Sequence, residues 1–374
     1  MKIYIIGPAH PYRGGIADSG IRLAQELQKV GEEVHLINFT KQYPSFLFPG
    51  KTQYSEEEPP KGLRIRRMIH SFNPFNWVKV GFKLKSERPD LVIVRFWLPF
   101  MGLAFGTICR IIRANRYTTI LSIPDNIKPH EKRIGDRILT RYFVASVDKF
   151  IALSAGVRQD LKEFTDKPAI ILPHPIYDIF GDKIDKGVAK EKFGLKPNDK
   201  AILFFGLIRD YKGLDLLLEA MLDERMKSYD VKLIVAGEYY SNREFYESFI
   251  INHNLSAQII KATHFIPNSE VSQYFSAADL VVQPYKTATQ SGITQIALHF
   301  SKPMIVTNVG GLPEVVKDQV TGFVVDQHPE SIADAVIKFY DLQLEAAFTE
   351  SVEKEKKKYQ WSFFVKKLLE FYKG

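Results

Sequence analysis

The chain has 374 residues, a length for which two domains are expected, and 45% of them are hydrophobic, which suffices for sizeable cores. Its single cysteine, Cys109, excludes an internal disulfide and is typical of a reducing cytosol, and no Cys/His cluster has metal-site spacing. The net charge of +8 indicates a solvated basic surface or an anionic partner, such as a nucleotide, a phospholipid surface or a charged glycan. No nucleic-acid-binding module accompanies this charge, so we expect no nucleic-acid partner.

Strands and helices alternate in the first half. Lys2–Ile6 is predicted to be a buried strand, because its apolar run is too short for a signal peptide. A loop with Gly14 and Gly15 follows, and Ser19–Val30 has the apolar spacing of a helix. Further β-type runs occur at Glu33–Asn38, Leu91–Val94, Thr118–Ser122, Lys149–Leu153 and Ala169–Leu172. This order is typical of a parallel α/β sheet.

Three stretches of the first half depart from the alternation. Thr40–Pro60 is rich in proline, glycine, aromatic and acidic residues, and we expect a long loop there, followed by a basic cluster at Arg64–Arg67. Phe96–Cys109 carries no charge but is shorter than the ~20 residues of a membrane span. We expect a strand end that continues into a buried helix; the alternative is a monotopic membrane contact.

The second half repeats the pattern after a predicted linker, Gly181–Lys200. Its strands are expected at Ile202–Phe205, Lys232–Ala236, Ala257–Ile260, Leu280–Gln283, Met304–Thr307 and Gly322–Val325. Trp361–Tyr372 has the spacing of an amphipathic helix, and a lysine-rich exposed face precedes it. We therefore predict an α/β protein with two Rossmann-like parallel-sheet domains, residues 1–175 and 176–355, followed by a C-terminal segment, residues 356–374.

One strand–loop–helix in the second half indicates an anion site. The strand Ile202–Phe205 ends at Gly206, and Arg209 and Lys212 lie in the short loop before a leucine-rich helix. Helix-start N–H groups and two cations at one point suit a phosphate group. The alternative is a surface loop with two solvated charges.

Three more loops follow predicted strands, where parallel sheets place their ligands, and a cleft between the two domains is the expected ligand site. In the first, Gly14 and Gly15 permit close backbone approach, but a plain tight turn explains them equally well. Pro284–Gln295 carries hydroxyls and amides ahead of a helix, which again suits phosphate. Glu314 ends the last loop, either accepting hydrogen bonds from substrate hydroxyls or complementing a helix dipole.

Several segments, taken together, resemble the GT-B retaining glycosyltransferases of family four. In the second half these are FFGLIRDYKGLDLLLEA, KLIVAGE, SAADLVVQPY, SKPMIVTNVGGLPEVV and TGFVV. The glycine loop and first helix RGGIADSGIRLAQELQKVGEEVHLI, the strand VDKFIALSAGVRQDL and the closing helix YQWSFFVKKLL complete the set. The resemblance covers nearly the whole chain and is weaker between Thr40 and Arg116.

The resemblance implies a GT-B fold whose C-terminal helix packs back on the N-terminal domain. It also implies a nucleotide-sugar co-substrate, held mainly by the C-terminal domain, and transfer without a cofactor or a metal ion. Arg209 and Lys212 would grip the donor diphosphate; the family usually has its arginine directly after the glycine, where this chain has Leu207. The residues assigned to the donor are Gly14, Gly15, Gly206, Glu238, Thr289, Gln290, Ser291, Gly292, Gln295 and Glu314.

Two departures from the family pattern stand out. The family has two glutamates eight residues apart in its third loop, whereas this chain has no acidic residue between Asp279 and Glu314. Hydroxyls, amides and backbone N–H groups would bind the donor there instead. Relatives often have histidine where Asp125 stands, so Asp125, His130 and Glu131 are candidates on the acceptor side; His130 alternatively serves a capping or structural role.

The predicted function is transfer of a sugar, with retention, to a glycan or lipid-linked acceptor in polysaccharide or glycolipid synthesis. The alternatives are a catalytically silent nucleotide-sugar or glycan-binding scaffold and a sugar-nucleotide epimerase of the same fold. We expect a cytoplasmic protein, with an anionic membrane surface at the inner face as a possible partner. Basic patches suggest this partner, together with the aromatic residues Phe72, Phe75, Trp77, Phe96, Trp97 and Phe100.

Overall fold

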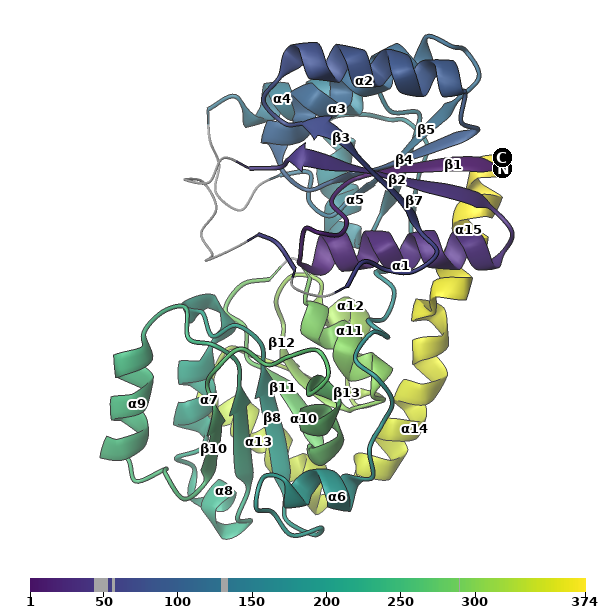
Figure 1. Cartoon of the computed structure of the whole chain (residues 1–374). Helices are drawn as coiled ribbons and strands as arrows, with labels where there is room; N and C mark the ends of the chain where they lie inside the picture. The colour runs from purple at the N-terminus through teal and green to yellow at the C-terminus, as the bar shows by residue number, and fades with distance from the viewer. Residues whose placement is uncertain (44–52, 56–57, 129–133, 289) are drawn as a thin grey trace. The chain divides into compact units, whose positions relative to one another are not determined.

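The computed structural model describes residues 1–43, 53–55, 58–128, 134–288 and 290–374 (Figure 1). The chain divides into two units. Unit 1 comprises Met1–His174 and Trp361–Gly374, and unit 2 comprises Pro175–Gln360. Each unit is built on one parallel sheet, which confirms the predicted fold class of two Rossmann-like α/β domains.

The sheet of unit 1 has seven strands in the order β3-β2-β1-β4-β5-β6-β7, and every pair is parallel. The strands are β1 (Lys2–Ile6), β2 (Glu33–Lys41), β3 (Arg64–His70), β4 (Leu91–Phe96), β5 (Thr119–Pro124), β6 (Lys149–Ala152) and β7 (Ala169–Ile171). β1 lies between β2 and β4, so the strand order reverses there, which is the usual ligand position in such sheets.

Helices cover both faces of this sheet. The helices are α1 (Gly15–Lys29), α2 (Pro74–Glu87), α3 (Gly102–Arg113), α4 (Asp136–Val144), α5 (Ala155–Lys162) and α15 (Trp361–Lys373), with a 3-10 turn, η2 (Pro99–Met101), before α3. One core joins the sheet to α2, α3, α4 and α5, and the other joins it to α1 and α15. β4 ends at Phe96 and α3 is largely buried, so the uncharged stretch is a strand end and a buried helix, as predicted.

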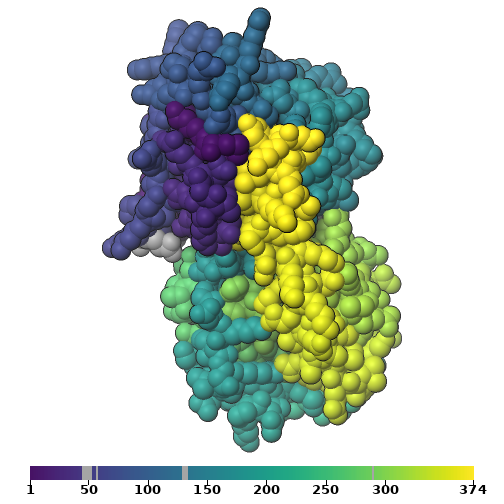
Figure 2. Space-filling view, turned by 90° about the vertical axis from the view of Figure 1, so that its right-hand side faces the viewer, coloured from purple at the N-terminus to yellow at the C-terminus, as the bar shows by residue number. Residues whose placement is uncertain are grey.

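The closing helix α15 packs on unit 1. Its buried face carries Trp361, Phe364 and Leu368, and the guanidinium carbon of Arg22 in α1 lies 5.5 Å from the Trp361 ring centroid. Lys149 Nζ donates hydrogen bonds to two carbonyl oxygens near the helix end. Figure 2 shows the N-terminal segment (purple) and this helix (yellow) side by side, which confirms that the chain returns to the N-terminal domain.

Unit 2 has a six-stranded parallel sheet in the order β10-β9-β8-β11-β12-β13. Its strands are β8 (Ala201–Phe205), β9 (Lys232–Ala236), β10 (Ile259–Ala262), β11 (Leu280–Gln283), β12 (Met304–Thr307) and β13 (Gly322–Val325). Its helices are α6 (Lys186–Glu191), α7 (Leu214–Ala220), α8 (Glu224–Ser228), α9 (Arg243–Asn252), α10 (Val271–Ala277), α11 (Gly292–His299), α12 (Leu312–Val315), α13 (Pro329–Asp341) and α14 (Glu345–Glu355), with 3-10 turns η3 (Asp210–Lys212) and η4 (Lys356–Tyr359). Apolar clusters fill both faces of the sheet.

Two elements of the fold were not predicted from the sequence. The basic cluster Arg64–Arg67 lies in edge strand β3, where Arg66 makes two hydrogen bonds to Glu87 at 2.7 and 2.8 Å. The predicted linker contains helix α6, capped by the Asp185 side chain and held by an ion pair from Lys190 to Asp279. Among the described residues, no helix combines the length and hydropathy that crossing a bilayer requires.

Candidate functional site

Three loops meet backbone to backbone at the carboxyl edge of the unit 2 sheet. Gly206, directly after β8, has φ +99°, and a Cβ on Gly237, after β9, would lie 2.2 Å from the Gly206 carbonyl oxygen. A Cβ on Gly213 would lie 1.9 Å from the carbonyl oxygen of Pro284, after β11. Glycine is therefore required at Gly213 and Gly237, because any side chain would push the loops apart.

Lys212 lies in the middle of these loops. Its side chain is 8% exposed, and among the residues that the structure describes it forms no ion pair. Its Nζ lies 5.6 Å from the Tyr285 ring centroid. Burial, and secondarily the charge of Arg209, lower its pKa to about 8. A buried cation without a counter-charge is costly, and a bound anion would relieve that cost.

Arg209 begins the short turn η3 that carries Lys212. Its guanidinium carbon lies 4.8 Å from the Tyr240 ring centroid. Lys286 fixes the turn, since its backbone N donates to the Tyr211 carbonyl at 2.7 Å and its Nζ pairs with Asp215 at 2.7 Å. The two predicted cations thus lie in a braced turn, not in a loose surface loop.

The loop after β11 leads into α11 in the same region. Ser291 caps the helix, its Oγ accepting from the Ile293 N–H at 3.2 Å and lying 3.3 Å from the Tyr285 hydroxyl. Gln295 is 4% exposed, and its Oε1 has no hydrogen-bond partner among the described residues. A Cβ on Gly292 would lie 3.0 Å from the Tyr177 ring. Gln290 is half-buried in this loop, and Thr289 lies outside the described residues.

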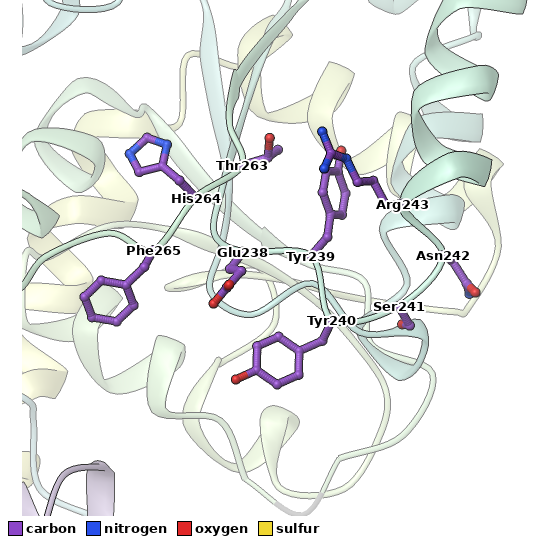
Figure 3. A pocket seen from close by; sticks show the side chains of 9 residues that line it. All are labelled: Glu238, Tyr239, Tyr240, Ser241, Asn242, Arg243, Thr263, His264 and Phe265. Atoms are coloured by element: carbon purple, nitrogen blue, oxygen red, sulfur yellow. The ribbon is translucent and has the colours of Figure 1, made fainter. Parts of the chain in front are cut away.

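Glu238 lines a pocket of about 440 Å³ beside the same edge (Figure 3). Its walls come from the loops after β9 and β10, and in Figure 3 the Glu238 carboxylate lies between the rings of Phe265 and Tyr240. Sequence reasoning missed His264, Phe265 and Tyr240. Their signal was present, because aromatic residues directly after two neighbouring strands must gather at one edge of a parallel sheet.

Glu314 lies in the first turn of the short helix α12, after β12, and its side chain is exposed. This position fits the helix-dipole interpretation, because an acidic side chain in the first turn complements the helix dipole. In unit 1, Gly14 occupies the N-cap position of α1 with φ +115°, a backbone conformation that favours glycine. Gly14 and Gly15 are both exposed, so the first N–H groups of α1 begin at an open surface.

Asp125 follows β5, at the carboxyl edge of the unit 1 sheet. Arg95, which is 4% exposed, donates to Asp125 Oδ1 at 2.6 Å and to Ser19 Oγ at 2.9 Å. Asp125 Oδ2 and Arg95 Nε are buried without hydrogen-bond partners among the described residues. The sequence analysis missed Arg95, whose signal was a single charge within the apolar strand LVIVRF. His130 and Glu131 lie outside the described residues.

No group of three or more metal-ligating side chains occurs in the part of the chain that the structure describes. Two family models match successive parts of the chain. The model described as Glycosyltransferase Family 4 matches residues 13–177, and the model described as Glycosyl transferases group 1 matches residues 185–358. The chain is a GT-B glycosyltransferase similar to family four.

Curated relatives and solved structures agree with this assignment. An uncharacterized glycosyltransferase of Methanocaldococcus jannaschii is 24% identical over 96% of this chain and 95% of its own length. The D-inositol 3-phosphate glycosyltransferase of Mycobacteroides abscessus is 29% identical over 83% of this chain and 68% of its own. Anabaena HepE, solved in complex with UDP, matches over 99% of both chains with a TM-score of 0.74 and 15% identity, which speaks to the fold alone.

Proposed function

We propose that this glycosyltransferase moves a sugar, with retention of configuration, from a nucleotide-sugar donor to a glycan or lipid-linked acceptor. The setting would be cell-surface polysaccharide or glycolipid synthesis. The observation that carries the proposal is Lys212, a buried cation that forms no ion pair with any described residue and lies where three loops meet. Complexes of Anabaena HepE with UDP and with UDP-glucose support a nucleoside diphosphate as the group that Lys212 receives.

The chemistry assigned to these residues is stabilisation of a leaving group. As the bond from the anomeric carbon to the phosphate oxygen breaks, negative charge develops on the diphosphate. Lys212, Arg209 and the N–H group of Gly292 would bind that charge, and preorganised donors of this kind contribute strongly to catalysis. The segment between Asp279 and Glu314 offers no carboxylate nucleophile, so the acceptor would attack from the face that the diphosphate leaves, passing its proton to the departing phosphate oxygen.

Other groups would bind the rest of the donor. The unpartnered Oε1 of Gln295 can accept a hydrogen bond from a sugar hydroxyl. The Glu238 pocket would take the nucleoside, with the carboxylate on the ribose and the Tyr240 or Phe265 ring against the base. On the acceptor side, Asp125 Oδ2 has no hydrogen-bond partner among the described residues and can accept a hydrogen bond that orients an acceptor, while the attacking hydroxyl gives its proton to the departing phosphate oxygen.

A matched pair of variants tests the role of Lys212. Lys212→Ala should lower turnover by about 10²- to 10³-fold and abolish the thermal shift given by UDP or another nucleoside diphosphate. The control is Lys302→Ala, because burial also lowers the pKa of Lys302 to about 8 but its Nζ already donates to the Ala278 carbonyl at 2.6 Å. A folded Lys302→Ala protein should keep its turnover. Near-normal turnover of Lys212→Ala would reject the proposal. A separate measurement in EDTA tests metal independence, because loss of turnover there would show that transfer needs a metal ion.

A silent binding protein is the second candidate, because the paired glutamates of the family are missing. It predicts calorimetric binding of a nucleotide sugar that depends on Lys212, with no hydrolysis or transfer for any acceptor. The first candidate predicts at least slow donor hydrolysis, since water can replace a missing acceptor. Measuring binding and hydrolysis on the same preparation separates the two.

A further inference from the structure

Helix α2 carries an unusual outward face. Phe75, Val78 and Phe82 follow one another on one side of the helix and are 88%, 41% and 56% exposed. The opposite side is buried in the core through Val80 and Leu84. A surface helix normally presents polar side chains to water, and single exposed apolar residues are common, but three on successive turns of one face mark an interaction surface.

The charges on this face have one sign. Lys79 and Lys83 are exposed beside the three apolar side chains, and among the described residues neither forms an ion pair. The one acidic residue of α2, Glu87, is turned to Arg66 and to the Tyr4 hydroxyl, and the Arg66 guanidinium lowers its pKa to about 2. The exposed face therefore offers apolar side chains and positive charge only.

The helix that carries this face is firmly seated. A Cβ on Gly81 would lie 2.9 Å from the Ile111 side chain, so α2 and α3 are in close contact, and Asn73 caps the start of α2. α4, two helices along in the same layer, repeats the chemistry with exposed Ile138 and Arg137 (Figure 1). Phe75 is one of the aromatic residues named from the sequence, but Phe96 is fully buried and Trp97 donates to Tyr43 within the fold, so those two do not belong to the surface.

We propose that the α2 surface, comprising Phe75, Val78, Lys79, Phe82 and Lys83, docks on an anionic lipid bilayer. Apolar side chains would enter the headgroup boundary and the lysines would pair with lipid phosphates, which is how amphipathic helices bind membranes. A second copy of this face would bring like charges together, which disfavours self-association. The inference deepens the proposed function, since it gives an enzyme with a lipid-linked acceptor its contact with the lipid.

The test uses the full chain and vesicles of phosphatidylcholine with or without phosphatidylglycerol. The wild-type protein should co-sediment with anionic vesicles at low salt, bind weakly to neutral ones, and dissociate as salt screens the lysines. Lys79→Gln/Lys83→Gln, which neutralises both lysines, should weaken the partition by on the order of thirtyfold. Phe75→Ser/Phe82→Ser should weaken it at any salt concentration, because it removes the apolar contribution.

The matched control lies on α9, which exposes Phe245 and Ile251 beside the acidic Glu244. Phe245→Ser/Ile251→Ser should leave vesicle binding unchanged. The proposal would be overturned if the wild-type protein did not bind anionic vesicles at low salt, or if the α9 variant lost binding to the same extent. It would also be overturned if the α2 surface bound an acidic protein but no vesicles. All of these side chains are exposed, so the variants should fold, and their unchanged affinity for UDP would separate failure of docking from failure of the donor site.

Discussion

Lys212 and Lys302 lie at opposite edges of the same unit 2 sheet, and burial lowers the pKa of each to about 8. At the amino edge, Lys302 donates to two carbonyl oxygens, and nearby Asp279 pairs with Lys186 and Lys190. At the carboxyl edge, Lys212 has no ion pair among the described residues. The two lysines thus share a lowered pKa but differ in geometry. Lys302 has acceptors within the fold, whereas the Lys212 ammonium has neither an ion pair nor a hydrogen bond among the described residues and is therefore the one prepared for a ligand.

A choice of ligand site by cavity volume would point to the amino edge of the unit 2 sheet instead. A pocket of about 980 Å³ lies at the amino edge, lined by Lys186, Lys190 and Asp279. Its polar groups already serve each other: Asp279 also accepts from the Ala201 N–H at 2.8 Å and from the Tyr340 hydroxyl at 3.0 Å. A group whose hydrogen bonds are satisfied within the fold gains little from a ligand, so this cluster is a brace for α6 and the sheet.

The strongest change in stability is expected when the ion pairs of Asp279 are removed. Burial alone would raise the pKa of Asp279, but the charges of Lys186 and Lys190 lower it below its ordinary value. Asp279→Asn removes this carboxylate and leaves Lys190, which is 2% exposed, without a counter-charge. We expect the free energy of unfolding of unit 2 to fall by about 3–5 kcal/mol in urea denaturation. The affinity for UDP should not change; a folded variant with weakened binding would contradict the division between the two edges.

The pH dependence of binding gives the next largest effect. The folded pKa of Lys212 lies near 8, below its unfolded value, so the ammonium that a diphosphate needs is present below pH 8 and is lost above it. We expect the affinity for UDP to fall about tenfold between pH 7 and pH 9 by calorimetry. Lys302→Ala should keep this dependence, whereas Lys212→Ala should bind weakly at both values.

The stability of the ligand-free protein should change in the opposite direction. Between about pH 8 and pH 10.5 the folded protein holds fewer protons on Lys212 and Lys302 than the unfolded chain does. The contribution of these two groups to stability therefore rises with pH across that window. If the affinity for UDP and the contribution of these lysines to the free energy of unfolding both fell above pH 8, Lys212 would not be the titrating group.

The same contrast between local and distant signals explains what the sequence could predict. β9, β11, β12 and β13 begin and end as predicted, because a continuous apolar run fixes a buried parallel strand by itself. β3 was missed, because an edge strand tolerates arginines on its solvated side, and the partner of Arg66 is 21 residues away in the chain. α6 was missed for the same reason, since its Lys190 is stabilised by Asp279 on a different element.

The candidate site divides in the same way. Gly206, Lys212 and Gly213 belong to one strand–loop–helix, so their spacing alone placed them together. Arg95 was missed, because its meaning depends on Asp125 and Ser19, which come from two other elements. When the partners of a residue come from distant parts of the chain, the sequence shows only one unusual residue type, such as a single charge inside an apolar strand.

Substitution of Gln295 should change the protein least. The buried Oε1 of Gln295 has no hydrogen-bond partner among the described residues, unlike the carboxylate of Asp279, so Gln295→Met should change the stability of the free protein by less than about 1 kcal/mol. If the oxygen accepts a sugar hydroxyl, the variant should keep its affinity for UDP but lose about tenfold in kcat/KM for the nucleotide sugar. An equal loss of UDP affinity would instead place Gln295 against the diphosphate. An unchanged kcat/KM would mean that the Gln295 oxygen contacts no ligand, and Lys212 would then be distinguished as a ligand-binding residue by its buried charge alone.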